Sequence, residues 1–391
     1  MKVAKEDFIP SQEDYEHEKI GIISAGPEGF DVVWMVRHQV MTRLANRFWT
    51  IWLEPARSWR HLRGHVSWPR TVKEPGWRRF LRYFPGFLPV VYRPRFVGRL
   101  FDALRLRQAA RALRRRGCEQ VVLYLWRPEF SHYPALVDAD RVVYHIDDEY
   151  TFSSQEVDIP LEERQLIESA DHVVIHSPAL MEKKGAINSA TTWVPNGVNF
   201  AEFSSPASEP GDLKDIPRPR AGYVGVVKRQ MDFEILHFLA KQRPDVSFVL
   251  VGPRGALGSD EKTLDDLVNM SNVFELGNKK PNELGAYMQH MDVLMMCYKN
   301  DDYTKYIYPL KLHEYLATGR PVIATPIRSV QGFSDVVMLA KNPQEWLRSL
   351  DKGLAPESNA AAMRHKRQST AQEHDWDVLV KKIERIVTDL D

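Results

Sequence analysis

The sequence predicts an α/β protein built from two doubly wound domains that face each other across a cleft. Its 391 residues exceed one typical core and suit two domains at about 150 residues each. Short apolar runs alternate with helix-like segments almost throughout, which is the pattern of parallel sheets covered by helices. Residues 200–220 are dense in Pro, Ser and Gly and have no apolar period, so they indicate a linker between two such series.

The series before the linker starts with a strand over 19–24, a Gly/Pro loop and a helix over about 34–46. A second strand is expected over 48–53. Four later runs are apolar on both faces, as strands buried between helix layers are. They span 121–126, 141–147, 172–177 and 191–195, with an acidic helix over 160–170 among them.

The series after the linker repeats this alternation. Its expected strands span 221–227, 247–253, 272–277, 293–298 and 321–325, and its helices span 232–242, 281–291 and 310–319. The tail is an amphipathic helix whose apolar face comprises Trp376, Leu379, Val380, Ile383 and Ile386. We therefore expect a first domain over 1–200, completed by the helix 375–391, and a second domain over 215–374. Open parallel sheets bind ligands at the carboxyl ends of their strands, which places the expected site in the cleft.

The composition is that of a globular protein, with 43% apolar and 27% charged residues, and it excludes disorder, collagen and coiled coil. Cys118 and Cys297 are far apart and form no CxxC pair, so we expect reduced thiols in a cytoplasmic protein. The charged N-terminus lacks the apolar segment of a signal peptide. No apolar run reaches the roughly 18 residues that a membrane-spanning helix needs.

The most specific motif spans 308–323, where a loop ends at Pro309 and a helix is expected to start. Lys311 and Glu314 are three residues apart and therefore share one face of its first turn. That turn offers free N–H groups and a positive dipole to a phosphate, and Lys311 adds a point charge. Glu314 can accept hydrogen bonds from ribose hydroxyls. The alternative is an exposed Lys–Glu pair on an ordinary helix, worth about 0.3 kcal/mol.

The stretch PLKLHEYLATGRPVIAT (309–325) resembles the nucleotide-binding helix of GT-B glycosyltransferases, notably family 4, the glycosyltransferase group 1. Further matches follow in the family's order, namely SADHVVIHSPAL, VPNGVNFAEF, GYVGVVKRQMDFEIL and NVFELGNKKPNELGAYMQHMDVLMM. The matches cover roughly residues 140–330, with weaker likeness over WMVRHQVMTRLANRFWTIWLEP. The approach Tyr308-Pro309-Leu310-Lys311 is also similar to that of xanthan-type glucuronosyltransferases. The resemblance implies two facing Rossmann-like domains and transfer of a sugar from a nucleotide diphosphate.

Carried onto this sequence, the resemblance implies a donor site made by Gly225, Lys228, Gly277, Asn278, Tyr308, Lys311 and Glu314. Gly225 would let the backbone approach the diphosphate, where a Cβ would collide. Lys228 or Arg229 would add charge there, together with Lys311. Gly277 and Asn278 would flank the base, and Glu314 the ribose. The chain departs from the family at Tyr306, because retaining members carry a second Glu eight positions before the ribose Glu. That departure weakens the expectation of a retaining reaction.

Three adjacent acids, Asp147, Asp148 and Glu149, follow the expected strand 141–147. The resemblance places Asp147 where many family members carry a cleft histidine, which is where a general base stands to take the acceptor proton. Adjacent acids raise one another's pKa, which suits a base near neutrality. Asp147, and after it Asp148, are therefore the candidate catalytic residues. A solvated acidic turn is the alternative.

Two further residues, Arg37 and His38, follow the Gly/Pro loop on the first expected helix and would face the cleft in this architecture. We expect them to contact the phosphate or sugar of an acceptor, and a surface or capping role is the alternative. The 13 histidines show no H-x₃-H spacing, so we expect no metal site and no cofactor besides the nucleotide-sugar substrate.

Residues 57–116 form a basic segment, with 17 Lys and Arg against Glu74 and Asp102, although the whole chain has a net charge of +1. Aromatic residues from Trp59 to Tyr92 are interleaved with these cations. Such a segment suits an anionic membrane surface, and the absence of RNA-binding motifs leads us to expect no nucleic acid. Pairing of the arginines with acids elsewhere is the alternative. The expected location is the cytoplasm, peripheral on the inner face of the cell membrane.

These observations together predict a hexosyltransferase-type glycosyltransferase of polysaccharide biosynthesis that needs no metal. It would move a sugar from a UDP- or GDP-sugar to a glycan or lipid-linked acceptor. Two alternatives stay open. One is a nucleotide-sugar epimerase on the same fold, which needs more carboxylates and histidines in the cleft. The other is a non-enzymatic protein that binds a membrane or nucleic acid through 57–116.

Overall fold

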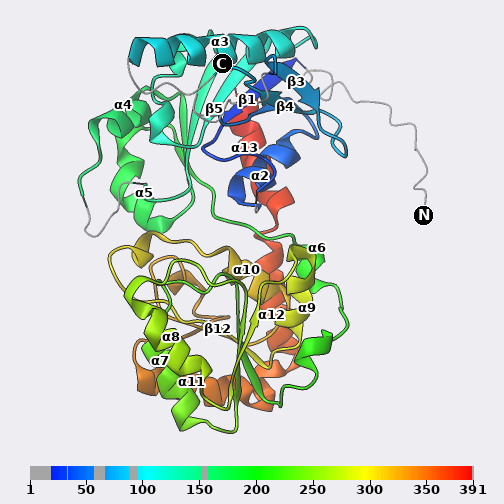
Figure 1. Ribbon diagram of the computed structural model, residues 1–391, viewed down its shortest axis with the longest axis vertical. Helices are drawn as coiled ribbons and strands as arrows, with labels where there is room; N and C mark the ends of the chain where they lie inside the picture. The colour runs from blue at the N-terminus through cyan, green and yellow to red at the C-terminus, as the bar shows by residue number, and fades with distance from the viewer. Residues whose placement is uncertain (1–18, 33, 57–66, 89–94, 151–156, 390–391) are drawn as a thin grey trace, which may run out of the picture.

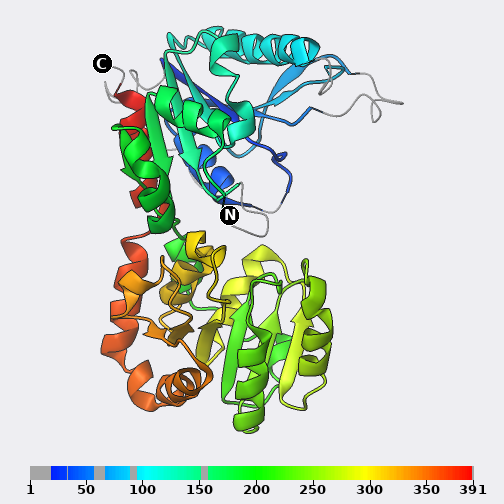
Figure 2. The same cartoon turned by 90° about the vertical axis from the view of Figure 1, so that its left-hand side faces the viewer.

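The computed structural model describes residues 19–32, 34–56, 67–88, 95–150 and 157–389. Two sheet-centred units lie one above the other along the long axis of the molecule (Figure 1). The first unit contains the strands β1–β8 and the second contains β9–β14. The last helix returns from the second unit to the first, as the side view shows (Figure 2).

The first unit is an eight-stranded sheet in the order β3-β4-β2-β1-β5-β6-β7-β8. Only the edge strand β3 is antiparallel to its neighbour among the described pairs. The strands are β1 (Ile20–Ala25), β2 (Trp49–Leu53), β3 (Arg70–Lys73), β4 (Phe80–Phe84), β5 (Gln120–Leu125), β6 (Arg141–Ile146), β7 (His172–Ile175) and β8 (Thr191–Trp193).

Helices cover both faces of this sheet, which is why its central strands are apolar on both sides. On one face lie α3 (Arg95–Arg114), α4 (Leu161–Ser169) and α5 (Pro178–Lys184), and their buried side chains share a core with alternate strand residues. On the other face lie α2 (Val36–Leu44) and α13 (Trp376–Thr388). The predicted apolar face of the tail helix is buried there against the first sheet.

The second unit is a six-stranded parallel sheet in the order β11-β10-β9-β12-β13-β14. Its strands are β9 (Arg220–Val224), β10 (Ser247–Val251), β11 (Val273–Gly277), β12 (Val293–Met296), β13 (Val322–Ala324) and β14 (Met338–Leu339). The helices α7 (Phe233–Gln242), α8 (Glu261–Val268) and α11 (Pro343–Leu354) cover one face. The helices α6 (Phe200–Ser204), α9 (Leu284–Gln289), α10 (Leu310–Ala317) and α12 (Ala361–Gln372) cover the other.

Residues 200–220 were expected to form a linker without packed structure, and this expectation is wrong. The segment begins with α6, and Phe203, Leu213 and Ile216 are buried in the core of the second unit. These apolar residues are too far apart to produce a period, so the sequence pattern did not reveal their packing. The domain bounds 1–200 and 215–374 remain predictions.

The basic segment contains structure that the sequence analysis did not expect, namely β3, β4 and the long helix α3. Two of its arginines, Arg79 and Arg82, are buried, so these two do not face an anionic surface, and the membrane contact expected of the whole segment stays a prediction. Arg82 pairs with Asp31 at 2.6 Å and with Glu54 at 2.7 Å, which are acids outside the segment. The parts of the segment at 57–66 and 89–94 lie outside the described residues.

Candidate functional site

The helix α10 meets the end of β9 at the centre of the second sheet. Its buried face includes Leu312, Tyr315 and Leu316. The hydroxyl of Tyr315 accepts a hydrogen bond from the backbone N–H of Val224 at 2.8 Å and donates to the carbonyl of the same residue at 3.1 Å. Both polar groups of Val224 are thereby tied to α10, which fixes the helix start beside the turn that follows β9.

Lys311 lies on this first turn and points back toward the strand. Its Nζ donates to the hydroxyl of Tyr223 at 2.6 Å and lies over the rings of Tyr223, at 4.0 Å from the centroid, and Tyr298, at 5.5 Å. The Tyr223 hydroxyl donates to the carbonyl of Val226, so its oxygen is left to accept from the lysine. Burial, together with the charge of Lys228, lowers the pKa of Lys311 to about 7, while Glu314 opposes the shift. A cation is thus held near the cleft with no carboxylate hydrogen-bonded to it in the described part of the chain.

Gly225 forms the turn directly after β9, and this turn lies against Lys311. Its φ is +144°, and a Cβ there would lie 2.7 Å from Nζ of Lys311. The glycine is therefore needed for the lysine as well as for any ligand. The carboxyl ends of β10 and β11 lie beside Gly225. A Cβ on Gly252, directly after β10, would lie 2.1 Å from the Gly225 carbonyl, and the Gly252 N–H donates to the carbonyl of Gly277, the last residue of β11, at 2.8 Å.

The remaining predicted donor residues fall into two groups. Lys228 is half-buried; burial lowers its pKa and the charge of Asp148 from the first unit opposes that shift. Gly277 ends β11 with φ +66°, and Asn278 is exposed beyond it. Tyr308 differs, because its side chain is buried and its hydroxyl lies 2.9 Å from Nε2 of His313. Its ring serves the core of the second unit, and only its backbone lies at the junction.

Glu314 is half-buried on the same face as Lys311. Burial raises the pKa of its carboxyl to about 7, against the opposing effect of Lys311. Among the described residues its carboxylate has no hydrogen-bond partner. It is therefore available to accept hydrogen bonds from a ligand, as the sequence predicts.

The two candidate catalytic acids differ in their surroundings. Asp147, directly after β6, accepts from Nη2 of Arg37 at 2.9 Å and from the hydroxyl of Tyr150, and its side chain is only 4% exposed. Burial raises its pKa and Arg37 opposes the shift. Asp147 is thus occupied by an ion pair inside the first unit.

Asp148 instead lines a cavity of about 510 Å³ between the two units. The first unit also contributes Arg127 and Tyr150 to this cavity, and the second unit contributes Arg229, Gln230, Lys299 and Tyr303. The Asp148 carboxylate accepts the backbone N–H of Glu149 at 2.8 Å. Its other oxygen has no hydrogen-bond partner among the described residues, so Asp148 faces the cleft more directly than Asp147.

A buried charge cluster fixes this acidic turn. The fully buried Lys184 donates to Glu163 at 2.7 Å and to Glu149 at 3.3 Å, and Lys183 approaches the second oxygen of Glu149 at 3.3 Å. Because Glu149 is anchored from α5, Asp148 beside it is held at a defined place on the cleft wall.

The predicted acceptor residues are both buried. Nδ1 of His38 accepts the N–H of Met35 at 3.1 Å and Nε2 lies 3.2 Å from the carbonyl of Phe30, while the ring stacks on Trp52. This imidazole belongs to an aromatic core and cannot reach a ligand without disrupting it, which corrects the expectation for His38. Arg37 pairs with Glu28 as well as Asp147, so it positions the acid rather than facing open solvent.

Several residues were missed by sequence reasoning. Tyr223 and Tyr298 enclose the Lys311 ammonium, and Asn196 of the VPNGV stretch donates to the carbonyl of Tyr308 at 2.7 Å. The contact from Asn196 ties the first unit to the loop before α10. Tyr223 stands two residues before the glycine turn, but tyrosine is common in buried strands and its position alone gave no signal.

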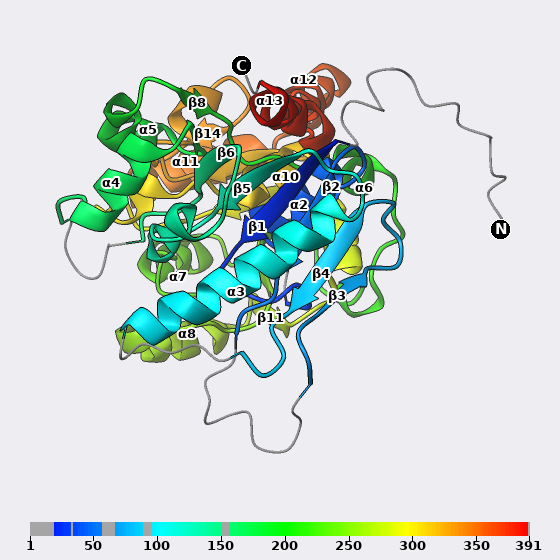
Figure 3. The same cartoon turned by 90° about the horizontal axis from the view of Figure 1, so that it is seen from above.

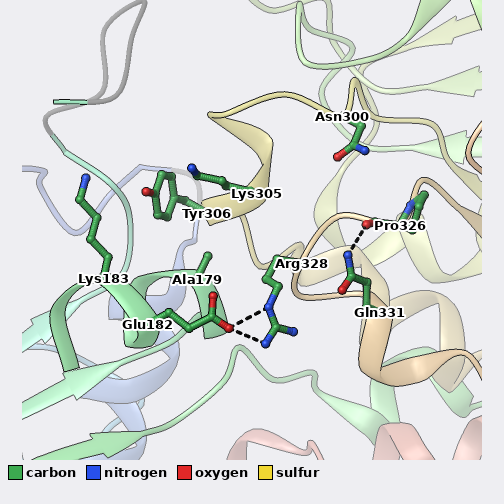
Figure 4. A pocket seen from close by; sticks show the side chains of 9 residues that line it. All are labelled: Ala179, Glu182, Lys183, Asn300, Lys305, Tyr306, Pro326, Arg328 and Gln331. Atoms are coloured by element: carbon green, nitrogen blue, oxygen red, sulfur yellow. Dashed lines mark hydrogen bonds and ion pairs between the residues drawn. The ribbon is translucent and has the colours of Figure 1, made fainter. Parts of the chain in front are cut away.

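A second cavity between the units, of about 520 Å³, lies beside α5 (Figure 4). Figure 4 shows Arg328 of the second unit paired with Glu182 of the first, and the Nε–Oε1 distance is 2.8 Å. Tyr306, the position where the chain departs from the family, is only 3% exposed and joins the core of the first unit. Its ring therefore acts as a contact between the units.

Within the described ranges, no group of three or more His, Cys, Asp or Glu side chains is arranged to hold a metal ion. None of the described helices is both long and apolar enough to cross a membrane. Cys118 and Cys297 are buried in different units and are not paired.

Comparison with known proteins agrees with this geometry. Residues 218–355 match the family model described as glycosyl transferases group 1. A putative teichuronic acid biosynthesis glycosyltransferase, TuaH of Bacillus subtilis, is 28% identical over 233 residues, which are 56% of this chain and 57% of the relative. A D-inositol 3-phosphate glycosyltransferase of Corynebacterium urealyticum is 24% identical over 252 residues, with the same shares of the two chains. The chain thus spans about half the length of these curated relatives.

Solved structures match over nearly the whole chain. An Escherichia coli protein described as trehalose-6-phosphate bound with UDP-2-fluoro glucose aligns with a TM-score of 0.69 at 10% identity, covering 95% of this chain and 99% of that one. Anabaena Alr3699/HepE, in complex with UDP and glucose, aligns with a TM-score of 0.63 at 13% identity, covering 95% and 100%. At such identities these matches show the fold alone. The resemblance found in the sequence is therefore confirmed at this level: the fold is that of GT-B proteins with two facing Rossmann-like units, and residues 218–355 match the glycosyl transferases group 1 family, whereas the likeness to xanthan-type glucuronosyltransferases stays a prediction.

Proposed function

We propose that the protein is a glycosyltransferase that moves a sugar from a nucleotide diphosphate to a glycan or lipid-linked acceptor in polysaccharide biosynthesis. The observation that carries the proposal is the pair Lys311 and Glu314 on the first turn of α10, against the glycine turn at Gly225. The family match and the name of the relative TuaH support a transferase of this class. UDP in the structures of similar fold favours a UDP-sugar as the donor.

Donor binding follows from the charges of the second unit. The charge of Lys228 is near enough to Lys311 to lower the pKa of Lys311. Neither lysine is hydrogen-bonded to a carboxylate among the described residues. A bound diphosphate would relieve the repulsion between the two ammonium groups, and its oxygens would accept hydrogen bonds from the backbone N–H groups at the start of α10. Glu314 would accept the ribose hydroxyls, and Gly277 and Asn278 would lie beside the base.

For the transfer step we propose Asp148 as the general base. Its oxygen would take the proton of the acceptor hydroxyl while that hydroxyl oxygen bonds to the anomeric carbon. The bond from the anomeric carbon to the diphosphate breaks, and the leaving charge is offset by Lys311 and Lys228. Asp147, next to this base in the sequence, would stay paired with Arg37. The predicted independence from metal ions stays a prediction.

The acceptor is proposed to come from a membrane. The exposed side of α3 presents Phe96 (73% exposed), Leu100 (58%) and Leu104 (38%) next to the exposed Arg107 and Arg111. A helix face that mixes bulky apolar side chains with cations suits an anionic leaflet. We therefore propose peripheral attachment to the inner face of the cell membrane through α3.

Two experiments test these proposals. Thermal stabilisation by UDP-, GDP- and TDP-sugars tests donor binding, and product analysis with and without acceptor separates transfer from epimerisation. No stabilisation by any nucleotide-sugar would reject the donor site. For the membrane, the paired change Phe96→Ser and Leu100→Ser should lower co-sedimentation with phosphatidylglycerol vesicles. Binding of single-stranded RNA instead of vesicles would favour the nucleic-acid alternative.

A further inference from the structure

A cavity of about 330 Å³ lies between the C-terminal half of α3 and the strands β3 and β4. The view from above shows α3 lying along the sheet with β4 and β3 beside it (Figure 3). Its charged lining consists of the guanidinium groups of Arg70, Arg115 and Arg116. Among the described residues that line it there is no Asp or Glu. A cavity of this size with only cationic charge is suited to a small anion.

The acids of the basic segment are engaged elsewhere. Glu74 approaches Nη1 of the buried Arg82 at 3.3 Å, and Asp102 pairs with Arg105 and with His132. The three cavity arginines therefore have no carboxylate bound to them among the described residues.

All three cavity arginines are exposed, and two of them, Arg70 and Arg116, make contacts with neutral groups that leave N–H groups free. Arg116 donates through Nη1 to the carbonyl of Ala112 at 2.8 Å and lies over the Trp49 ring at 5.3 Å. Arg70 lies over the Phe84 ring at 5.6 Å. Arg115 is exposed, and its guanidinium has no hydrogen-bond partner in the described part of the chain.

Gln108, which is half-buried, adds an amide donor to the wall of this cavity. Its Oε1 accepts the Tyr83 hydroxyl at 2.6 Å, which fixes the amide in the cavity wall. The amide nitrogen has no partner among the described residues and lines the same cavity. An oriented amide donor beside three guanidinium groups matches the acceptor oxygens of a phosphate.

We propose that this cavity is a phosphate-binding site, distinct from the donor site in the second unit. It takes the phosphate group of a membrane phospholipid or a phosphate in solution. The lipid source rests on the proposed membrane contact of α3, whose exposed apolar residues lie on the adjoining side of the helix. The phosphate chemistry does not rest on that contact.

The test compares two charge-matched double variants of the full chain. Arg70→Gln with Arg115→Gln removes two cations from the cavity, whereas Lys381→Gln with Lys382→Gln removes two exposed cations of α13 that do not line it. Binding of inorganic phosphate is measured by calorimetry at low salt. We expect the cavity variant to bind about tenfold more weakly or not at all and the control to keep wild-type affinity. Equal affinities in both variants, or no phosphate binding by the wild type, would overturn the proposal.

Vesicles then identify the source of the phosphate. Co-sedimentation with phosphatidylcholine vesicles, with and without phosphatidylglycerol, should fall more in the cavity variant than in the control. If phosphate binds at the cavity but no vesicle does, the ligand is a soluble phosphate and the membrane proposal fails alone. If vesicle binding falls equally in the cavity variant and the control, and neither variant loses affinity for phosphate, then the vesicles respond only to net charge and the cavity proposal fails. UDP affinity, measured alongside, should match the wild type in both variants because the donor site lies in the other unit.

Discussion

The charge state of Lys311 gives the sharpest prediction for the donor site. Burial lowers its pKa to about 7, so the free protein loses this cation as the pH rises above neutrality. A bound diphosphate favours the charged form and therefore raises the pKa. Binding then takes up a proton, and we predict that affinity for UDP falls as the pH is raised from about 7 to about 9.

The size of the effect follows from linkage. Each pH unit above the pKa of the free protein costs about 1.4 kcal/mol, or tenfold in affinity, as long as the bound lysine stays charged. Two units therefore predict up to about a hundredfold loss. The nucleotide contributes little to this change, because a phosphate with a second pKa of about 6 is already ionised at neutral pH. Glu314 is coupled to Lys311, and its loss of a proton over the same range would support the charged lysine and reduce the slope.

The assay is titration calorimetry with UDP at several pH values, in buffers of different ionisation enthalpy so that proton uptake is measured directly. Lys311→Met keeps the length of the side chain and removes the charge. It should bind UDP about tenfold to a hundredfold more weakly near pH 7, with little dependence on pH. Lys241→Met, on the exposed side of α7 in the same unit, is the matched control. Wild-type affinity that stays constant from about pH 7 to about 9, without proton uptake, would refute the reasoning.

Three further predictions concern other parts of the structure. Asp148→Asn should abolish transfer and keep UDP affinity, as judged by a product assay beside calorimetry; full activity in this variant with loss in Asp147→Asn would restore Asp147 as the base. Gly225→Ala should weaken UDP binding and lower the melting temperature, since its Cβ would lie 2.7 Å from Nζ of Lys311 at a positive φ; unchanged values would show that the turn adapts. Lys184→Met should cost about 3–5 kcal/mol in urea unfolding because it leaves the Glu163 carboxylate buried without its cation, while Glu149 keeps Lys183; a loss below about 1 kcal/mol would mean that water reaches Glu163.

The sequence predicted the elements whose pattern is local. Strands such as β6 and β12 appeared as short apolar runs, and α10 was indicated by a proline, an apolar face and a terminal glycine. It did not predict β4 or α3, because the abundance of arginine in 57–116 concealed their apolar faces. Whether an arginine there is buried depends on acids such as Asp31 and Glu54, which are far from Arg82 in the sequence. Pairing at that distance leaves no periodic signal.

The candidate site shows the same limit at closer range. Lys311 and Glu314 could be placed on one face from their spacing alone, whereas the contrast between Asp147 and Asp148 depends on Arg37, a partner from another element. Similarly, His38 and Tyr308 occupy motif positions but have side chains turned into cores. Residue type and position identified the neighbourhood of the site, and the packing around each side chain decided which of its members face the cleft.

The two halves of the cleft are built independently, which has a consequence for function. The Lys311 side is fixed by the hydrogen bonds of Tyr315 to Val224, entirely within the second unit. The acidic turn is fixed by Lys184, entirely within the first. Of the contacts that cross between the units, the pair of Arg328 with Glu182 is exposed and contributes little to stability, whereas Tyr306 and the hydrogen bond from Asn196 to Tyr308 are buried. A change in the angle between the units would therefore alter the distance from the proposed base Asp148 to the proposed phosphate site at Lys311 without disturbing either half, so that donor binding and transfer should respond separately to mutation.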